Sequence, residues 1–216
     1  MNTFTKRIIT GIVAGLVFFG IFAYLPPIIF SLLLLLLLMT ILVTEWPRLA
    51  QATWWLWVLT PVYPVLPFLG MIWLNHAGPD GRWLLVQLLI AVFSFDTGAY
   101  LVGSLIGRHK LLPQVSPGKT WEGFFGGVLC MSGVLVVTST QQYRLPTVFV
   151  QALLIGIVGT IGDLFESWLK RRAYIKDSGV ILPGHGGLLD RFDGVMMVMI
   201  GIIVMRLVSP CKTLIF

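Results

Sequence analysis

Residues 28–44 of the chain read IIFSLLLLLLLMTILVT, an apolar run without a charged side chain. About 20 such residues allow a helix to cross the ~30 Å hydrocarbon core of a bilayer. A helix also satisfies its backbone polar groups internally, as a membrane requires. Runs of this kind recur, and seven spans are expected, at about 8–25, 28–44, 54–74, 83–106, 121–140, 147–168 and 193–209. The sequence therefore predicts an all-α, polytopic integral membrane bundle with about seven transmembrane helices.

Composition agrees with this fold class. Hydrophobic residues make up 57% of the 216 positions, against ~45–50% in soluble domains, which excludes an ordinary soluble protein. The net charge of +6 suits anionic lipid surfaces and phosphorylated substrates. Since no linker or repeat is visible, residues 1–216 are interpreted as a single integral membrane domain. Its N-terminal helices occupy residues 1–82, and residues 83–216 carry the polar clusters and the catalytic core.

The basic residues predict the orientation in the membrane. With the N-terminus in the cytoplasm, eleven Lys and Arg residues fall on that side and three on the other. An excess of this kind is typical of cytoplasmic loops. The N-terminus and the polar loops are therefore expected to face the cytoplasm, where nucleotides are found. The expected location is the bacterial cytoplasmic (inner) membrane.

Three smaller features of the spans also carry expectations. The three prolines between residues 61 and 67 should kink or locally unwind the third span. Glycines spaced four apart, such as Gly103 and Gly107, are interpreted as close contacts between helices. The Glu45-Trp46 pair at the end of the second span is interpreted as an interfacial anchor.

The C-terminal polar cluster, Gly162 to Asp193, reads GDLFESWLKRRAYIKDSGVILPGHGGLLDRFD and holds five of the nine acidic residues. Asp163 and Glu166 are spaced to share one helix face, and Asp190 and Asp193 repeat that spacing. Two helix ends that each offer two carboxylates can converge on a hard cation, and Mg²⁺ suits them best. Salt bridges within a loop are the alternative, but they explain Asp163 less well because it lies inside an apolar span. A polyphosphate would be held by the cations of the cluster, Lys170, Arg171, Arg172, Lys176 and Arg191.

His185 lies between these carboxylate pairs, in a Pro-Gly-His-Gly-Gly turn. With no second histidine nearby, a zinc site is not expected. The turn can place His185 against a phosphate, and a merely structural turn is the alternative.

The N-terminal polar cluster consists of Asp96 and residues 107–123. Asp96 lies mid-span, where a carboxylate needs a cation, a donor or water, and function is favoured over an interhelical hydrogen bond. Cationic side chains, two hydroxyls and backbone donors lie at the start of the following helix, and such groups suit phosphate oxygens. The alternative is a basic cytoplasmic loop that ends in a helix cap. A nucleotide P-loop is excluded because Pro113 stands where that motif needs glycine. The candidate substrate-binding residues of this cluster are Asp96, Ser116, Lys119, Thr120 and Glu122.

The C-terminal cluster closely resembles the signature of the phosphatidate cytidylyltransferase family, also called CDP-diacylglycerol synthase. That signature begins with Ser and runs through Lys-Arg, Lys-Asp, Pro-x-His-Gly-Gly and Asp-Arg-x-Asp at fixed spacing. It is present here without a gap, as Ser167, Lys170, Arg171, Lys176, Asp177, Pro183, His185, Gly186, Gly187, Asp190, Arg191 and Asp193. The N-terminal cluster also resembles the family, at Asp96, Gly107-Arg108, Ser116-Pro117 and Lys119-Thr120-Trp121-Glu122-Gly123. The likeness covers the chain from about residue 90 onward and is weak before it.

The resemblance implies transfer of a cytidylyl group from CTP to phosphatidic acid, with release of pyrophosphate. It also implies a metal centre on Asp163 and Asp190, and we add Glu166 and Asp193 as supporting ligands of Mg²⁺; a second, monovalent cation is left open. The expected partners are CTP, phosphatidic acid, the lipid bilayer and a second copy of the chain, without a nucleic acid. The expected catalytic residues are Asp163, Asp190, Lys170, Arg171, Lys176 and Arg191.

Two departures from the family pattern leave alternatives open. Gly118 stands where the family usually has a second lysine, which keeps an inactive relative among the alternatives, and the chain is shorter than typical members. A CDP-alcohol phosphotransferase shares the opening Asp190-x-x-Asp193-Gly194, but the rest of its motif is missing. A transporter is disfavoured because the charges gather on one side of the membrane and no inverted repeat is visible.

Overall fold

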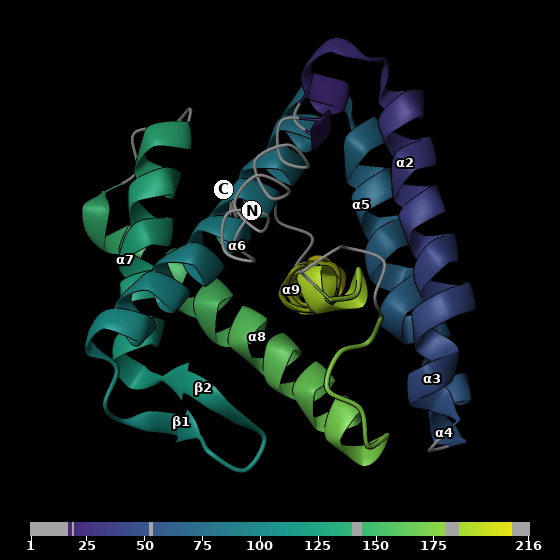
Figure 1. Cartoon of the computed structure of the whole chain (residues 1–216). Helices are drawn as coiled ribbons and strands as arrows, with labels where there is room; N and C mark the ends of the chain where they lie inside the picture. The colour runs from purple at the N-terminus through teal and green to yellow at the C-terminus, as the bar shows by residue number, and fades with distance from the viewer. Residues whose placement is uncertain (1–16, 19, 52–53, 140–143, 180–185, 209–216) are drawn as a thin grey trace, which may run out of the picture. The chain divides into compact units, whose positions relative to one another are not determined.

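The computed structural model describes residues 17–18, 20–51, 54–139, 144–179 and 186–208. Helices dominate it (Figure 1), in agreement with the expected fold class. In chain order the helical elements are α2 (Pro27–Thr40), η1 (Ile41–Glu45), α3 (Trp46–Ala50), α4 (Trp55–Leu59), η2 (Pro61–Val65), α5 (Leu66–His76), α6 (Gly78–Ile106), α7 (Trp121–Thr138), α8 (Leu145–Arg172) and α9 (Leu189–Val208). Two short strands, β1 (Lys110–Leu112) and β2 (Ser116–Thr120), come between α6 and α7 in the sequence.

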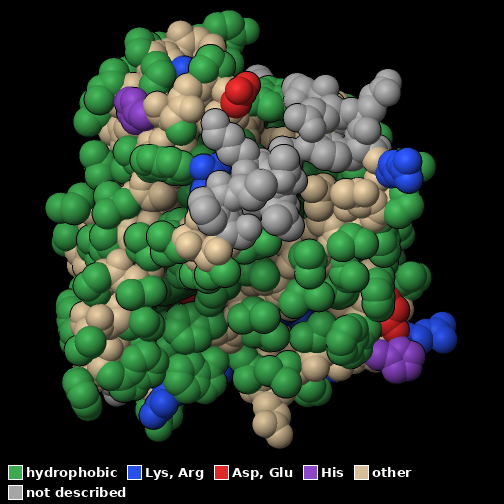
Figure 2. All heavy atoms as spheres, turned by 180° about the vertical axis from the view of Figure 1, so that it is seen from behind, with side chains coloured by type: hydrophobic (Ala, Val, Ile, Leu, Met, Phe, Trp, Pro, Cys, Tyr) green, Lys and Arg blue, Asp and Glu red, His purple; other side chains and the backbone are tan. Residues whose placement is uncertain are grey.

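Five helical stretches are long and apolar enough to cross a membrane: Pro27–Ala50, Trp55–His76, Gly78–Ile106, Trp121–Thr138 and Leu145–Arg172. Apolar side chains on them point outward; Val43, Val58 and Val137, for example, are 69%, 71% and 84% exposed. Hydrophobic side chains predominate on the face that Figure 2 shows. Because a soluble protein rarely exposes large apolar patches, these observations confirm the polytopic membrane class.

The expected number of seven spans is not confirmed. The first predicted span, 8–25, falls mostly on residues outside the described part of the chain. The last one corresponds to α9, which is not among the five stretches. Its 20 residues include four charged side chains, at positions 190, 191, 193 and 206.

The chain forms two compact units. Unit 1 comprises residues 1–78 and 169–192, and unit 2 comprises residues 79–168 and 193–216. The last turn of α8 and the first turn of α9 therefore belong to unit 1, and the remainder of both helices belongs to unit 2.

Unit 1 is built on the pair α2 and α5, which run side by side (Figure 1). Asn75 on α5 links the two helices, because its Nδ2 donates to Pro27 O at 2.7 Å and to Ser31 Oγ at 2.9 Å. The side chain of Phe68 packs on that of Phe192, with ring centroids 5.6 Å apart. The core of this unit thus extends from the N-terminal helices to the first turn of α9.

The expected kink in the third span is confirmed. Between α4 and α5 the backbone of Tyr63 leaves the helical region, with φ −143° and ψ 112°. Pro64 follows it directly and Pro61 lies two residues before it, and each lacks the N–H that a regular helix would use. The hydrogen bond from Trp46 Nε1 to Thr60 Oγ1, at 2.8 Å, ties this bend to α3.

Unit 2 packs α6, α7 and α8 around the ring of Phe95. A Cβ atom added to Gly127 on α7 or to Gly156 on α8 would come within 2.7 Å and 2.8 Å of that ring. Gly123 on α7 similarly lies against the backbone oxygen of Ala99 on α6. Close contact through glycine, as predicted for the spaced glycines, is therefore what brings these helices together.

Residues 110–120 of the N-terminal polar cluster, where the sequence analysis expected only a basic loop, form an antiparallel β-hairpin. Lys110 pairs with Thr120 and Leu112 with Ser116. The strands are very short and include a proline and a glycine, so they give no alternating apolar pattern. The hairpin ends directly at α7, because Thr120 is both the last residue of β2 and the N-cap of the helix.

Candidate active site

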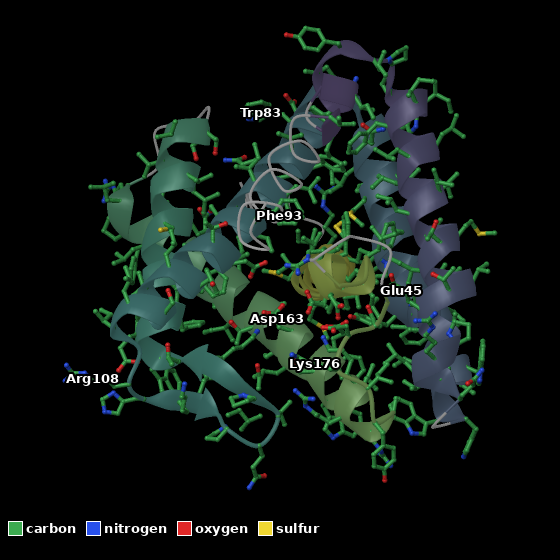
Figure 3. All side chains as sticks on the ribbon, in the orientation of Figure 1. Glu45, Trp83, Phe93, Arg108, Asp163 and Lys176 are labelled. Carbon is green, nitrogen blue, oxygen red and sulfur yellow. The ribbon has the colours of Figure 1, made fainter. Side chains whose placement is uncertain are left out.

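Lys119 brings the two polar clusters together in unit 2. Its Nζ donates to Oδ2 of Asp163, which lies 44 positions away on α8. Successive side chains of a strand point to opposite faces, so Lys119 can reach α8 while Thr120 turns into the protein. The hairpin therefore carries a lysine to the carboxylate of Asp163, which Figure 3 labels on α8.

Asp163 belongs to a group of acidic side chains that we call the unit 2 carboxylate cluster: Asp96, Asp163, Glu166 and Asp193. Asp193, on α9, is buried and interacts electrostatically with the other three, and it shares a hydrogen bond with Glu166. Three helices, α6, α8 and α9, thus contribute acidic groups that interact electrostatically at Asp193. Asp193 also accepts from the backbone N of Gly194 at 2.8 Å.

Two glycines next to the aspartates explain why α8 and α9 approach so closely. A Cβ atom on Gly162 would come within 2.6 Å of the backbone oxygen of Asp193. A Cβ atom on Gly194 would lie 3.1 Å from Oδ1 of Asp163. Each glycine thus makes room for the partner helix at the position adjoining its own aspartate. In the sequence, this close approach of the two helices is indicated by a glycine next to an aspartate in each of them, Gly162-Asp163 and Asp193-Gly194.

Asp190, on the first turn of α9, organises a second group of polar contacts in unit 1. Lys170 Nζ donates to its Oδ1 at 2.7 Å. The backbone N–H groups of Gly187 and Ser178 donate to its Oδ2 at 2.8 Å and 3.2 Å. Gly186 has φ +84°, a conformation that favours glycine, and a Cβ atom there would lie 2.7 Å from Asp190 Oδ2.

Glu45 is a site residue that the sequence analysis missed, and its interpretation as an interfacial anchor is wrong. The residue, which Figure 3 labels, is fully buried in unit 1. Its carboxylate accepts from Ser178 Oγ at 2.9 Å and from the backbone N of Leu188 and of Leu189, each at 2.8 Å. A lone carboxylate directly after a long apolar run was the available signal, because such a group needs donors when it is buried.

Thr120 and Glu122 have structural contacts around the hairpin. Thr120 Oγ1 accepts from the backbone N of Gly123 at 3.1 Å, which is an N-cap of α7. Glu122 accepts from the backbone N of Arg108 and His109, each at 3.2 Å, and from His109 Nδ1 at 2.6 Å. Their role in substrate binding stays a prediction.

The remaining predicted residues lie as follows. Ser116 is a half-buried residue at the start of β2. Arg171, Lys176 and Arg191 are exposed residues of unit 1. His185 lies outside the described residues.

The carboxylate oxygens of the unit 2 cluster are the donors that Mg²⁺ prefers, so the residue types fit the predicted metal. Within the described part of the chain, no three or more His, Cys, Asp or Glu side chains are grouped so that they could hold a metal ion. Asp163 belongs to unit 2 and Asp190 to unit 1, and their sharing of an ion stays a prediction.

Comparison with known proteins shows which family has sequences similar to this chain. A sequence model described as the Cytidylyltransferase family matches residues 28–209. A phosphatidate cytidylyltransferase of Staphylococcus epidermidis is 44% identical over 137 residues, which cover 61% of this chain and 52% of that protein. A phosphatidate cytidylyltransferase of Mycobacterium leprae is 47% identical over 120 residues, covering 54% of this chain and 38% of that protein. The chain spans about half the length of the first of these relatives.

Proposed function

The chain belongs to the cytidylyltransferase family, and from this premise we propose that it transfers a cytidylyl group from CTP to phosphatidic acid. The products are CDP-diacylglycerol, a precursor for phospholipid synthesis, and pyrophosphate. The observation that carries the proposal is that the matched region contains both polar clusters. The names of the relatives, phosphatidate cytidylyltransferases, support the same substrates.

The reaction needs no activated serine or cysteine. An oxygen of the phosphatidic acid phosphate, already anionic, attacks the α-phosphorus of CTP and forms the new P–O bond. The bond from the α-phosphorus to the bridging oxygen breaks, and pyrophosphate leaves with the electron pair. The protein has to bring two polyanions together and stabilise charge on the phosphoryl oxygens, so positioning and electrostatics dominate.

Cationic side chains held in place by aspartates supply this stabilisation. A lysine ammonium has three donors, so Lys119 can bind Asp163 and a phosphate oxygen at the same time. We assign the same task to Lys170, which is oriented by Asp190. The exposed cations Arg171, Lys176 and Arg191 would neutralise the remaining charge of the triphosphate and the lipid phosphate.

Mg²⁺ is the cofactor that we propose. Asp163 and Asp190 would hold it, with support from Glu166 and Asp193. When bound, the ion neutralises charge on phosphate oxygens, which is its usual contribution to phosphoryl transfer. We leave a second, monovalent cation open.

The location and assembly follow from the sequence and the family resemblance. We propose that the polar loops face the cytoplasm of a bacterial cell, on the inner side of its cytoplasmic membrane, because basic residues concentrate there. We also propose a homodimer. Acyl chains of phosphatidic acid would stay in the bilayer while the headgroup enters the site.

The test is an assay of the purified protein in liposomes. CTP labelled at the α-phosphate, phosphatidic acid and Mg²⁺ are supplied, and the lipid products are separated. Labelled CDP-diacylglycerol and stoichiometric pyrophosphate are expected. A parallel reaction with CDP-diacylglycerol and an alcohol tests the phosphotransferase alternative. Lipid product only in that parallel reaction would overturn the proposal.

A further inference from the structure

Glu45 is a buried carboxylate, and among the described residues its hydrogen-bond donors are Ser178, Leu188 and Leu189 of unit 1, more than 130 positions away in the sequence. Two of those donors are the backbone N–H groups of Leu188 and Leu189, where α9 begins. The first N–H groups of a helix have no partner within the helix. A side chain of the second span therefore supplies the acceptors that fix the start of α9.

The same backbone is held from its other side by Asp190. Ser178 uses its hydroxyl for Glu45 and its backbone N–H for Asp190. Gly187 donates its N–H to Asp190, and the next residue, Leu188, donates to Glu45. Neighbouring donors thus alternate between the two carboxylates. We call Glu45 and Asp190, together with their donors Ser178, Gly187, Leu188 and Leu189, the unit 1 clamp.

Glycines leave the space that this clamp needs. A Cβ atom on Gly179 would lie 2.6 Å from Glu45 Oε1, and one on Gly187 would lie 2.6 Å from Glu45 Oε2. Side chains at either position would push the carboxylate away from its donors. Gly179 and Gly187 therefore leave room for the carboxylate of Glu45.

We propose that Glu45 is a positioning residue that acts on substrate phosphate through Asp190 and Lys170. Without Glu45, Ser178 and the start of α9 lose three hydrogen bonds, and Asp190 is attached to that same backbone. Lys170 in turn takes its orientation from Asp190. The proposal rests on the proposed cytidylyl transfer, in which Lys170 binds a phosphate.

The main variant is Glu45→Gln, which keeps the shape of the side chain. Its amide offers one acceptor oxygen to donors that surround two oxygens, so part of the clamp is lost. Thr60→Val is the matched control, because it removes the hydrogen bond from Trp46, the neighbour of Glu45 in the same unit. Ser178→Ala is a second variant, which removes a single donor of Glu45 and carries the test if Glu45→Gln does not fold.

Two measurements are made on each variant. Steady-state kinetics with CTP and phosphatidic acid should show a fall in kcat of about tenfold to a hundredfold for Glu45→Gln, the scale of misplacing a reacting group. The kcat of Ser178→Ala should also fall, but by a smaller factor. The kcat of Thr60→Val should stay near that of the parent protein. Hydrogen exchange at the amides of Leu188 and Leu189 should be faster in Glu45→Gln than in the control.

The outcomes separate this inference from the proposed function. Equal losses of kcat in Glu45→Gln and Thr60→Val would overturn the positioning role, as would parental kcat in both Glu45→Gln and Ser178→Ala. A parent protein that makes no CDP-diacylglycerol would instead overturn the proposed function. Hydrogen exchange then decides whether Glu45 fixes the start of α9, and unchanged exchange in Glu45→Gln overturns that role.

Discussion

At the scale of single residues, Lys119 has the most informative contact of unit 2. It lies on a strand of five residues, and its ammonium reaches Asp163 on a different element. Both side chains are partly buried, with 28% and 18% exposure, so the pair is screened less by salt than a surface pair. Lys119 therefore joins the predicted phosphate-binding loop to the predicted metal-binding helix.

We expect Lys119→Gln to lower kcat/KM for CTP by about 10²-fold, the scale of losing one preorganised group that stabilises phosphoryl charge. The loss should remain at saturating CTP, because the lysine also orients Asp163. Lys110→Gln, an exposed lysine of β1 in the same hairpin, is the control and should leave kcat/KM near the parental value. Equal kinetics in the two variants would contradict the assignment.

Asp190 carries a prediction of its own, because it orients Lys170 and is a proposed metal ligand. Asp190→Asn should cost ~3 kcal/mol or more of transition-state stabilisation. Initial rates with labelled CTP are compared with those of Asp80→Asn, a change at an exposed aspartate of α6. Activity of Asp190→Asn within about threefold of the parent, under ~1 kcal/mol, would remove Asp190 from the site.

At the scale of elements, α8 and α9 are held together by glycines beside their aspartates. Gly162→Ala should lower the free energy of unfolding by about 1–3 kcal/mol, the usual cost of overpacking. The backbone oxygen of Asp193 cannot rotate away from the new methyl group, so activity should fall as well. Thermal unfolding in detergent and the liposome assay measure the two effects.

Gly133→Ala is the control for this prediction, since a Cβ atom on that exposed position of α7 meets nothing within 4 Å. In an open helical position, alanine should raise stability by about 0.5–1 kcal/mol relative to glycine. A thermal midpoint of Gly162→Ala at or above that of Gly133→Ala would show that α8 and α9 do not touch at Gly162.

The elements themselves were predictable where hydropathy defines them. The expected spans 83–106 and 147–168 correspond to α6 (Gly78–Ile106) and α8 (Leu145–Arg172), but both helices continue beyond the apolar run. Hydropathy reports membrane depth, whereas helical hydrogen bonds continue into polar residues such as those at the end of α8. The hairpin was not predictable by the same means, because its pattern is too short.

At the scale of the whole molecule, the site could be predicted in its residue types more than in its contacts. Asp163 and Lys119 stand out in the sequence as charges in an apolar chain, but their pairing depends on how the hairpin meets α8. Glu45 was misinterpreted because its donors lie more than 130 positions away and are largely backbone groups. A sequence motif identifies side chains only. Every residue except proline has a backbone N–H, so the sequence does not show which of these groups donate to a carboxylate.

Orientation in the membrane is the last expectation, and two tyrosines of unit 1 can test it. Tyr24, before α2, and Tyr174, after α8, are 87% and 97% exposed. In a background with Cys130→Ser and Cys211→Ser, Tyr24→Cys should react with an impermeant maleimide in intact spheroplasts. Tyr174→Cys should react only after permeabilisation, because basic residues concentrate on its side and hold it in the cytoplasm. Labelling of Tyr174→Cys in intact spheroplasts would place the proposed active-site segment outside, away from CTP.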